Sequence, residues 1–415
     1  MTSSSTTEDR EKVVSKLPAW LRQALKIRAA QLATDIQDAV ASGITAWRAL
    51  GSNLSPIDTS GAEPFATVLA PGQWADFRSD CKDRGVSLIQ GLAQSVQLWL
   101  DNNPAPDVKR PTITRRVIVC NQKGGVGKTA ITAGTGEALA EDPATLMPVR
   151  VSKHFAALLE EDGHATQADP LVLEDLPGLG QRVLLVDFDP QGHLTKQLGH
   201  LPLPIGGDSL TNHMAGEAKG HLRDVIVNID HFGDRLHLLP ACTDAFLLDV
   251  RLASVRAREA ALERALAPVE GDYDVVLVDC PPSLGLSMDA AAYYGRRRPD
   301  ETPGNSGVLI IVQAEDSSAD AYDLLTTQIE DMRNDLALDL DYLGIVVNHY
   351  DARRGFIATS SLQAWMDIKD PRVVGVIGDL KEQKEAVRVK RPLLAYAPRC
   401  EQSVALRALA REISK

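Results

Sequence analysis

The chain has 415 residues, of which 44% are hydrophobic and 24% charged, and its formal net charge at pH 7 is −12. This length predicts two or three domains with a buried core, and no apolar run approaches the roughly 18 residues of a membrane span. The acidic balance excludes a generally polycationic nucleic-acid binder, so any such surface must be a local patch. The five cysteines show no Cys-x-x-Cys spacing, which argues against a structural zinc or iron–sulfur site and suits a reducing cytoplasm.

The N-terminal quarter of the chain contains a weak internal repeat. Residues 1–9 have no apolar core and predict a disordered tail rather than a secretory signal. Residues 10–101 then hold two units, each a short strand, a helix, a turn and a second helix. The strands are expected at Lys12–Pro18 and Phe65–Pro71, and Thr34 and Ser87 are the expected N-caps of the second helices.

This repeat resembles the ribbon-helix-helix fold, in which two such units pair their strands and read DNA with them. Both units would here lie in one chain. Lys12 and Lys16 would share one face of the first strand, and the run from Lys12 to Arg28 has five basic residues and no acidic one. The second strand offers mostly Ala66 and Val68 on that face, which are poor readers of phosphates or bases. Lys12 and Lys16 are therefore candidate DNA-binding residues, and a small helical domain for dimer or partner contacts is the alternative.

A glycine-rich segment follows at Cys120–Thr129, with the sequence Cys-Asn-Gln-Lys-Gly-Gly-Val-Gly-Lys-Thr. A short apolar run precedes it and a helical stretch, Ala130–Ala140, follows it, which is the pattern of a phosphate-cradling loop. Glycines let successive backbone N–H groups point at phosphate oxygens, and the helix N-terminus adds a partial positive charge. Lys128 would reach the β- and γ-phosphates, and the Thr129 hydroxyl can hold Mg²⁺. The expected cofactors are ATP and Mg²⁺, and the expected nucleotide contacts are Lys123, Gly124, Gly125, Val126, Gly127, Lys128, Thr129 and Ala130.

Gln122 stands where the usual loop has its first glycine, and Lys123 follows it. In this the segment resembles the deviant loop of the ParA/MinD ATPases, the partition and positioning NTPases. The resemblance implies that Lys123 crosses to the nucleotide of the partner subunit in an ATP-sandwich homodimer. It also implies an α/β P-loop NTPase fold, with a mostly parallel sheet flanked by helices and here preceded by a small, mainly helical N-terminal domain. Ala130 is a departure, because a second threonine is usual there and its loss removes one contact to the α-phosphate.

The domain that carries this loop is expected at residues 113–415, after a proline-rich, polar linker at 102–112. Within it, residues 141–181 form an insertion with eight acidic and two basic residues. We expect a helix within Val151–Asp162 and a loop from Pro170 to Gly180. The insertion is interpreted as a solvated surface excursion, with a partner-binding element as the alternative.

Two further apolar runs end in aspartates. Val183–Gly192 contains Asp187-Phe-Asp189-Pro-Gln, and Tyr273–Ser283 ends in Asp279-Cys-Pro-Pro-Ser. Ligands bind at the carboxyl ends of strands in open α/β sheets. The same resemblance implies that Asp189 positions or activates the attacking water, that Asp187 lies near the Mg²⁺ shell and that Asp279 holds Mg²⁺ through water. The catalytic candidates are Lys123, Lys128 and Asp189, and the metal candidates are Thr129, Asp187 and Asp279.

The rest of the chain supplies more strands for such a sheet. Three are predicted at Leu236–Pro240, Gly307–Val312 and Tyr342–Val347, and their apolar character suits a parallel sheet covered on both faces. A long helix is expected over Ala241–Leu266 and an amphipathic one over Ser403–Ile413. Asn348 follows the last of the strands, where related ATPases contact the adenine.

Two basic segments near the C-terminus, Asn348–Gly355 and Lys381–Arg391, are candidate DNA contacts. In ParA proteins, arginines and lysines in these places form a sequence-independent DNA surface across the dimer. The second segment departs from the family, since Asp379-Leu-Lys-Glu382 replaces an Arg-Asn-x-Arg-like run, yet it keeps five basic residues against two acidic ones. A charged, solvated helix is the alternative. The candidates are Arg353, Arg354, Lys381, Lys384, Arg388 and Lys390.

The motifs together predict a ParA-like partition ATPase. Mg²⁺-dependent ATP hydrolysis would be coupled to ATP-sandwich dimerisation and non-specific DNA binding, and a ParB-type centromere-binding protein would stimulate it. The protein is expected in the cytoplasm, associated with the nucleoid and without membrane contact. Two other functions stay open: a nucleotide-switched transcriptional regulator whose N-terminal domain binds operator DNA, and a MinD-like or cargo-positioning ATPase.

Overall fold

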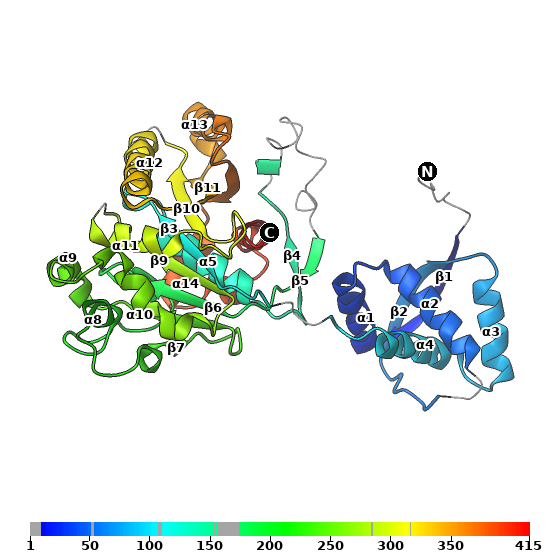
Figure 1. Ribbon diagram of the computed structural model, residues 1–415. Helices are drawn as coiled ribbons and strands as arrows, with labels where there is room; N and C mark the ends of the chain where they lie inside the picture. The colour runs from blue at the N-terminus through cyan, green and yellow to red at the C-terminus, as the bar shows by residue number, and fades with distance from the viewer. Residues whose placement is uncertain are drawn as a thin grey trace. The chain divides into compact units, whose positions relative to one another are not determined.

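The computed structural model describes residues 10–50, 54–106, 110–152, 174–283, 285–315 and 317–415, together with Phe155, Ala156 and Leu159; at residues 317–321 it describes the backbone alone. The expected tail, residues 1–9, lies outside this range. The chain divides into two compact units, Met1–Asp107 and Val108–Lys415, and their boundary falls inside the segment that we expected to be a linker (Figure 1). Among the described helices, none is long and apolar enough to span a membrane.

The N-terminal unit consists of two strand–helix–helix repeats. Its elements are β1 (Glu11–Pro18), α1 (Ala19–Gln31), α2 (Ile36–Ala49), β2 (Ala62–Leu69), α3 (Gln73–Asp83) and α4 (Leu88–Asn102). The two strands pair antiparallel, from Glu11 opposite Leu69 to Pro18 opposite Ala62. This element order matches the expected repeat, and the relation to ribbon-helix-helix proteins stays a prediction.

The second helices of the two repeats, α2 and α4, pack closely against each other. A Cβ on Gly43 would lie 2.5 Å from the Ser95 carbonyl oxygen, so the crossing requires glycine. Beside it, the Trp47 indole donates to Gln94 Oε1 at 3.0 Å, which satisfies both buried groups.

Of the two expected N-caps, one is confirmed and the other is wrong. Ser87 caps α4 by accepting from the Gln90 N–H at 3.2 Å, as expected. Thr34 as the cap of α2 is wrong, because its hydroxyl donates to the Leu32 carbonyl at 3.3 Å and Asp35 takes the N-cap position.

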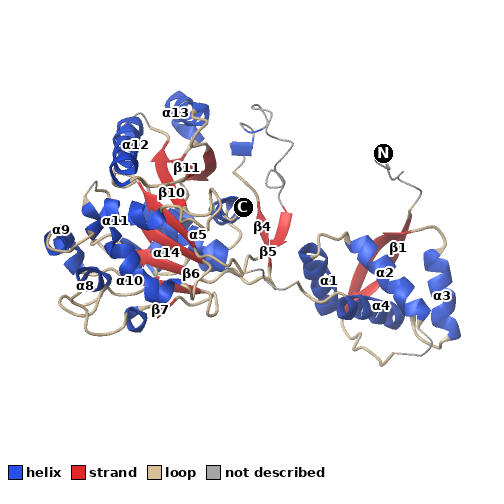
Figure 2. Ribbon diagram, viewed as in Figure 1, coloured by secondary structure: helices blue, strands red, loops and turns tan. Residues whose placement is uncertain are grey.

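The second unit is built on an eight-stranded sheet with the strand order β12-β11-β10-β3-β9-β6-β8-β7 (Figure 2). All neighbours in it are parallel except β7 and β8. The mostly parallel P-loop sheet predicted from the sequence is confirmed, with β3 at its centre. The strands are β3 (Arg115–Cys120), β6 (Val183–Asp187), β7 (Val227–Asn228), β8 (Leu236–Leu239), β9 (Val275–Asp279), β10 (Gly307–Gln313), β11 (Tyr342–Tyr350) and β12 (Val373–Gly378).

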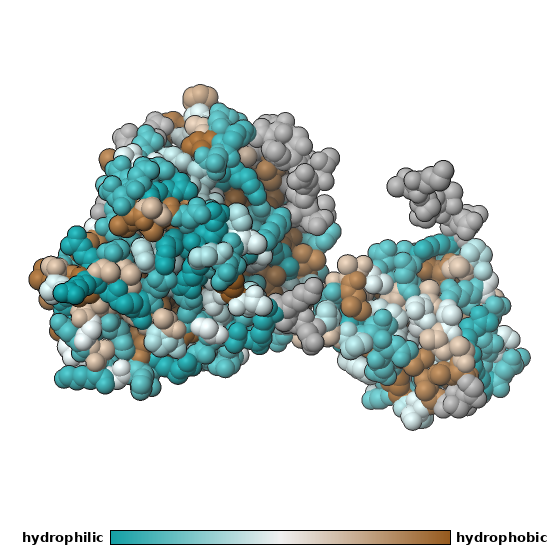
Figure 3. All heavy atoms as spheres, in the orientation of Figure 1, coloured by the Kyte–Doolittle hydropathy of each residue, from teal (hydrophilic) through white to brown (hydrophobic). Residues whose placement is uncertain are grey.

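Helices cover both faces of this sheet, which explains the continuous apolar runs of its strands. One apolar core contains buried residues of α8 (Leu210–Ala215), α9 (Leu248–Leu252), α10 (Ala261–Glu270), α11 (Leu286–Gly295), α12 (Ser317–Leu336) and α13 (Phe356–Asp367). The other contains residues of α5 (Lys128–Ala140), α7 (His193–Gln197), α14 (Lys381–Val389), α15 (Leu393–Tyr396) and α16 (Glu401–Ile413). The face of this unit seen in Figure 3 is accordingly mostly hydrophilic, with apolar side chains scattered over it.

The long helix expected over Ala241–Leu266 is wrong. The segment breaks into η4 (Thr243–Leu247), α9, η5 (Arg258–Ala260) and α10. Asp244 is buried there, accepts from the Gly206 N–H at 2.9 Å and lies 3.8 Å from Arg251. Ala257 has a φ of 47°, which a continuous α-helix does not allow. Tertiary contacts therefore override the local helix preference.

The acidic insertion begins and ends on a small antiparallel ladder of β4 (Leu146–Val149) and β5 (Glu174–Pro177). The loop expected from Pro170 to Gly180 is thus wrong where β5 lies, and most of the expected helix at Val151–Asp162 falls outside the described residues. Helix α16 contacts the insertion near both of its ends. Arg407 forms a buried ion pair with Glu141 at 2.7 Å, and the Arg411 guanidinium donates to the Pro177 carbonyl.

Candidate functional site

The glycine-rich loop lies between the end of β3 and the start of α5. Gly125 and Gly127 have φ values of 78° and 89°, in the left-handed region that favours glycine. A Cβ on Gly127 would lie only 2.0 Å from Nδ2 of Asn348, whereas a Cβ on Gly124 or Gly125 would meet nothing within 4 Å. Gly127 is therefore required by packing, and the other two glycines leave the backbone open to a ligand.

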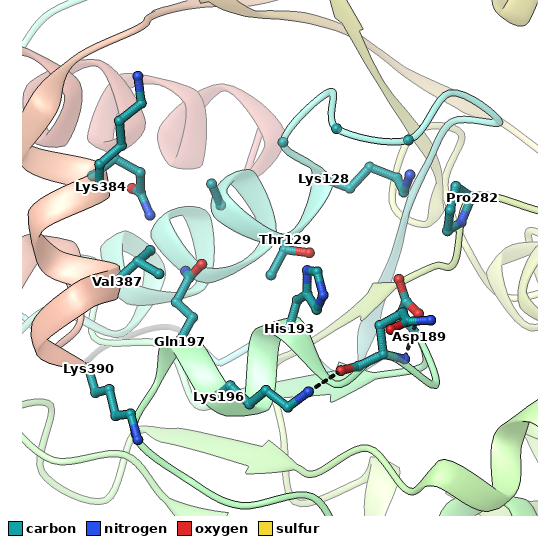
Figure 4. Close-up of a pocket in the computed structure, with 16 residues that line it drawn as sticks. Lys128, Thr129, Asp189, His193, Lys196, Gln197, Pro282, Lys384, Val387 and Lys390 are labelled. Carbon is teal, nitrogen blue, oxygen red and sulfur yellow. Dashed lines mark hydrogen bonds between the residues drawn. The ribbon is translucent and has the colours of Figure 1, made fainter.

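A cavity of about 760 Å³ opens on this loop, a volume typical of small-molecule sites. Its loop wall consists of Gly124, Gly125, Gly127, Lys128, Thr129 and Ala130. The remaining walls come from the loop after β6, the loop after β9, α7 and α14, namely Asp189, Gln191, His193, Lys196, Gln197, Pro282, Gln383, Lys384, Val387 and Lys390 (Figure 4). The sequence analysis missed the contributions of α7, because the segment carries no motif beyond the glycine that precedes it.

Two buried carboxylates meet beside the loop. Asp187 and Asp279 are opposite each other in the register of β6 and β9. Asp279 accepts from the Thr129 hydroxyl at 2.8 Å and from the Thr132 hydroxyl at 3.3 Å. Burial, and next the charge of Asp187, raise the pKa of Asp279 to about 8. Burial also raises the pKa of Asp187 to about 6, although Thr195 donates to its Oδ2 through both N–H (2.7 Å) and hydroxyl (2.6 Å).

The side chains around Asp187 and Asp279 are suited to binding Mg²⁺. Oδ1 of Asp187 is buried and finds no hydrogen-bond partner among the described residues. No cluster of three or more His, Cys, Asp or Glu side chains suited to a metal occurs in the described part of the chain. Mg²⁺ keeps several waters and uses one or two carboxylates plus substrate phosphates rather than an all-protein cage. Thr129, Asp187 and Asp279 are thus brought together as expected for the metal candidates.

The raised pKa values predict how pH affects stability without Mg²⁺. A carboxyl whose folded pKa lies above its unfolded value destabilises the folded chain increasingly as pH rises between the two values. For Asp279 this range extends to about pH 8. In EDTA, Asp279→Asn should therefore raise the melting temperature relative to the parent chain more at pH 8 than at pH 6. Thermal unfolding of both proteins at the two pH values measures this, and an equal difference at both would contradict it.

Lys128 and Asp189 both line the cavity. The Lys128 side chain is buried, which lowers its pKa, and its Nζ donates to the Lys123 carbonyl at 3.3 Å. Figure 4 shows Lys128 and Asp189 on the side of the cavity near Pro282. Oδ1 of Asp189 accepts from the Gln191 N–H at 2.9 Å, which fixes the turn that carries it. Both residues thus border the part of the cavity where a terminal phosphate would lie.

The side chain of Lys123 does not belong to the described lining of this cavity. Its Nζ lies 3.4 Å from Oε2 of Glu315, and Oε1 of the same carboxylate lies 3.0 Å from Arg354. The two basic candidates, one expected at a nucleotide and one at DNA, therefore share a single acidic partner.

Asn348 lies inside β11 rather than after it, so its expected place at the end of a strand is wrong. Its side chain is fully buried, and Nδ2 donates to the Val126 carbonyl at 2.9 Å. Oδ1 has no hydrogen-bond partner among the described residues. Asn348 thus stabilises the glycine-rich loop through its hydrogen bond to Val126. Its contact with adenine stays a prediction.

The candidate DNA residues of this unit differ in whether they line the nucleotide cavity. Arg353 is 86% exposed and pairs with Asp351 at 2.8 Å, close to Arg354. Lys381 and Arg388 are exposed on α14 and are not among the described residues that line the cavity. Lys384 on the same helix and Lys390 directly after it do line the cavity (Figure 4).

The N-terminal unit carries the remaining basic candidates. Lys12 and Lys16 are exposed on β1, opposite Val68 and Pro64 of β2. Because directly opposed residues of an antiparallel pair share a face, one strand supplies cations and the other apolar side chains. A hollow of about 550 Å³ beside this face is lined by Lys12 and the α1 residues Arg22 and Lys26.

Comparison with known proteins finds chromosome-partitioning ATPases among the relatives of this chain. A family profile described as "AAA domain" matches residues 163–342. The chromosome-partitioning ATPase Soj of Thermus thermophilus is 31% identical over 301 residues, which cover 72% of this chain and 95% of Soj. The chromosome partitioning protein ParA of Caulobacter vibrioides is 28% identical over 305 residues, covering 72% and 93%. An uncharacterized protein of Mycobacterium tuberculosis is 31% identical over 309 residues, covering 72% and 77%.

Solved structures show the same fold. The McdA–ATP complex of Cyanothece superposes with a TM-score of 0.53 at 17% identity, covering 73% of this chain and 98% of McdA. Cobyrinic acid a,c-diamide synthase of Mycobacterium smegmatis, with a bound ATP analog and magnesium, gives a TM-score of 0.50 at 28% identity, covering 72% and 93%. With the deviant loop, its two lysines and the paired aspartates in place, the chain belongs to the ParA/MinD family of P-loop ATPases.

Proposed function

We propose that this protein is a DNA-partition ATPase that hydrolyses Mg²⁺-ATP as a homodimer. One observation supports this most directly. The glycine-rich loop carries two lysines, and Lys128 lines the cavity of its own subunit while Lys123 is held outside it by Glu315. A lysine whose present ion pair lies outside its own cavity can exchange that contact for one in the site of a second copy.

Within one subunit, different residues of the site would bind the phosphates, the attacking water and Mg²⁺. The loop amides and Lys128 bind the β- and γ-phosphates, because backbone N–H groups and a buried cation neutralise phosphate charge. Asp189 orients a water molecule towards the γ-phosphate from the loop after β6. Thr129 and Asp279, with Asp187 beside them, would hold Mg²⁺, which when bound neutralises charge that develops on the phosphate oxygens.

Glu315 contacts both Lys123, which is expected at a nucleotide, and Arg354, which is a DNA candidate. When Lys123 leaves Glu315 for the nucleotide of the partner subunit, Glu315 keeps Arg354 as a neighbour at 3.0 Å. Two copies joined in this way would present two sets of Arg353 and Arg354. Doubling the number of phosphate contacts raises affinity and steepens its dependence on salt. DNA binding should therefore require the ATP-bound dimer, and a ParB-type partner would accelerate its release by stimulating hydrolysis.

The experiment is a DNA titration of the full chain with ATP, with ADP and without nucleotide, at two salt concentrations. A random-sequence duplex should bind tightly only with ATP and Mg²⁺, and the affinity should fall steeply with salt. Arg353→Ala with Arg354→Ala should remove this binding while ATP binding is kept. Equal affinity in all three nucleotide states would contradict the partition function.

A second candidate function rests on the N-terminal ribbon, where Lys12 and Lys16 stand on an exposed strand face beside Arg22 and Lys26. A ribbon that reads base edges would prefer particular sites and would not need ATP. In the same titration, Lys12→Ala with Lys16→Ala should then abolish nucleotide-independent binding to duplexes from the protein's own promoter region. If that binding is absent from the parent chain, the alternative role of the ribbon in dimer or partner contacts is favoured.

A further inference from the structure

The start of helix α13 presents a continuous run of five exposed residues, 353–357. Phe356 is 83% exposed, more than any other large apolar side chain of the described residues, and Ile357 is 63% exposed. Single apolar side chains are common on protein surfaces and need no explanation. Here two of them closely follow two arginines, Arg353 and Arg354, so that apolar and cationic side chains come together in one short segment.

The helix that carries this run is firmly packed. Its buried face contains Trp365, whose indole donates to the Gln313 carbonyl at 3.0 Å and whose ring meets that of Tyr322 edge-on at 5.3 Å between centroids. Figure 1 shows α13 at the outer edge of the unit, beside α12, and Figure 3 shows apolar side chains at the surface there. Phe356 and Ile357 are thus exposed on an anchored helix rather than on a free loop.

The two arginines can change partners at little cost. Gly355, with a φ of 73°, makes the turn between them and the helix. Arg353 pairs with Asp351 at 2.8 Å and Arg354 with Glu315 at 3.0 Å, and both arginine side chains are exposed. Exposed ion pairs contribute little to stability, so either guanidinium can exchange its carboxylate for a phosphate.

The small size of the apolar part decides which partner it fits. A membrane surface needs a long apolar helix face or additional anchors. Beyond its first two residues, however, α13 exposes Thr359, Gln363, Ala364 and Asp367, none of them a large apolar residue. DNA needs less, because one or two apolar side chains can enter between neighbouring base pairs while cations contact the backbone. The run 353–357 supplies both.

We propose that Phe356 and Ile357 form a wedge that enters between two base pairs of bound DNA, while Arg353 and Arg354 contact the flanking phosphates. Such an insertion unstacks one base step and kinks the duplex. Pyrimidine–purine steps such as TA unstack most easily, so the protein should prefer DNA that is rich in them. The proposal rests on the proposed ATP-dependent DNA binding and adds a contact with the base stack to its phosphate contacts.

The first test measures the affinity of the full chain, with Mg²⁺ and a non-hydrolysable ATP analogue, for a duplex rich in TA steps. Phe356→Ala should weaken binding about tenfold, the order of one base–aromatic stacking contact. The salt dependence should stay unchanged, because no phosphate contact is lost, whereas Arg353→Ala should lower the slope of log affinity against log salt by about one. Leu336→Ala is the matched control, since it removes a leucine that is 41% exposed at the end of α12.

The second test detects unstacking directly. A duplex with 2-aminopurine beside a TA step should gain fluorescence when saturated with the parent chain or Leu336→Ala, and less with Phe356→Ala. Unchanged fluorescence with the bound parent, or equal affinities of Phe356→Ala and Leu336→Ala, would overturn the wedge and leave the DNA-partition function standing. If the parent chain does not bind DNA with ATP, both proposals fail.

Vesicles that contain anionic lipid test the other partner for the same side chains. If the parent chain floats with the vesicles and Phe356→Ala does not, the pair is a membrane anchor and the DNA wedge is overturned. Phe356→Ala should keep the ATP affinity and the circular dichroism spectrum of the parent, because the side chain is exposed and is not among the described residues that line the nucleotide cavity.

Discussion

Lys128→Ala is expected to lower the affinity for ATP at least about 100-fold, or ~2.7 kcal/mol. The lysine is buried in the cavity wall, and the loop amides alone cannot neutralise the charge of the terminal phosphates. Lys123→Ala should instead leave ATP affinity within about threefold of the parent value, because its side chain pairs with Glu315 outside the cavity. Isothermal titration with a non-hydrolysable ATP analogue measures both affinities.

The defect of Lys123→Ala should appear when dimerisation, rather than ATP affinity, is measured. Lys123→Ala should remain monomeric with ATP and Mg²⁺ at concentrations where the parent dimerises, as seen by chromatography with light scattering. Glu315→Gln is an informative comparison, because it removes the negative charge that pairs with Lys123 and keeps the lysine itself. Equal loss of ATP affinity in the two lysine variants would refute a role for Lys123 at the partner subunit.

Asp189→Ala is expected to keep ATP binding and to lower the turnover number by a factor of about 100 to 10,000, the range for removal of a general base or a water-positioning group. The side chain lines the cavity from the loop after β6 and is not part of the glycine-rich loop. Its removal therefore spares contacts made in the ground state. Steady-state phosphate release and ATP titration measure the two quantities.

With hydrolysis blocked, the Asp189→Ala protein should accumulate as an ATP-bound dimer that stays on DNA. Asp189→Asn serves as the control for local structure, since an amide oxygen can still accept from the Gln191 N–H that shapes the turn. If chromatography of Asp189→Ala with ATP and Mg²⁺ gives only monomer, the sandwich-dimer hypothesis fails.

Contiguous motifs account for the part of the site that sequence analysis predicted well. The glycine-rich loop and the strand-end aspartates lie where expected, because phosphate binding uses successive backbone groups of one strand–turn–helix unit. The parallel sheet was predictable for a similar reason, since strands buried on both faces need continuous apolar runs. Asp187 and Asp279 are far apart in sequence, but both end parallel strands, so their meeting follows from the fold.

Other features depend on contacts between distant segments. The pairing of Lys123 and Arg354 with Glu315 joins three loops, and no periodicity in the sequence signals it. The helix expected over Ala241–Leu266 breaks because Asp244 is drawn towards Gly206 and Arg251.

By itself, the sequence determined the chemistry of the phosphate end of the site, because that chemistry is encoded in a short continuous segment and two strand ends. Only the tertiary structure decided which side chains of the basic C-terminal run border the cavity. Lys381, Lys384, Arg388 and Lys390 form one basic run in the sequence, yet Lys384 and Lys390 line the cavity and the other two are not among its described lining residues. Lys381, Lys384 and Arg388 are three and four residues apart on α14, so helical periodicity places them on one face and cannot separate them. Which of them borders the cavity depends on how α14 packs on the rest of the unit.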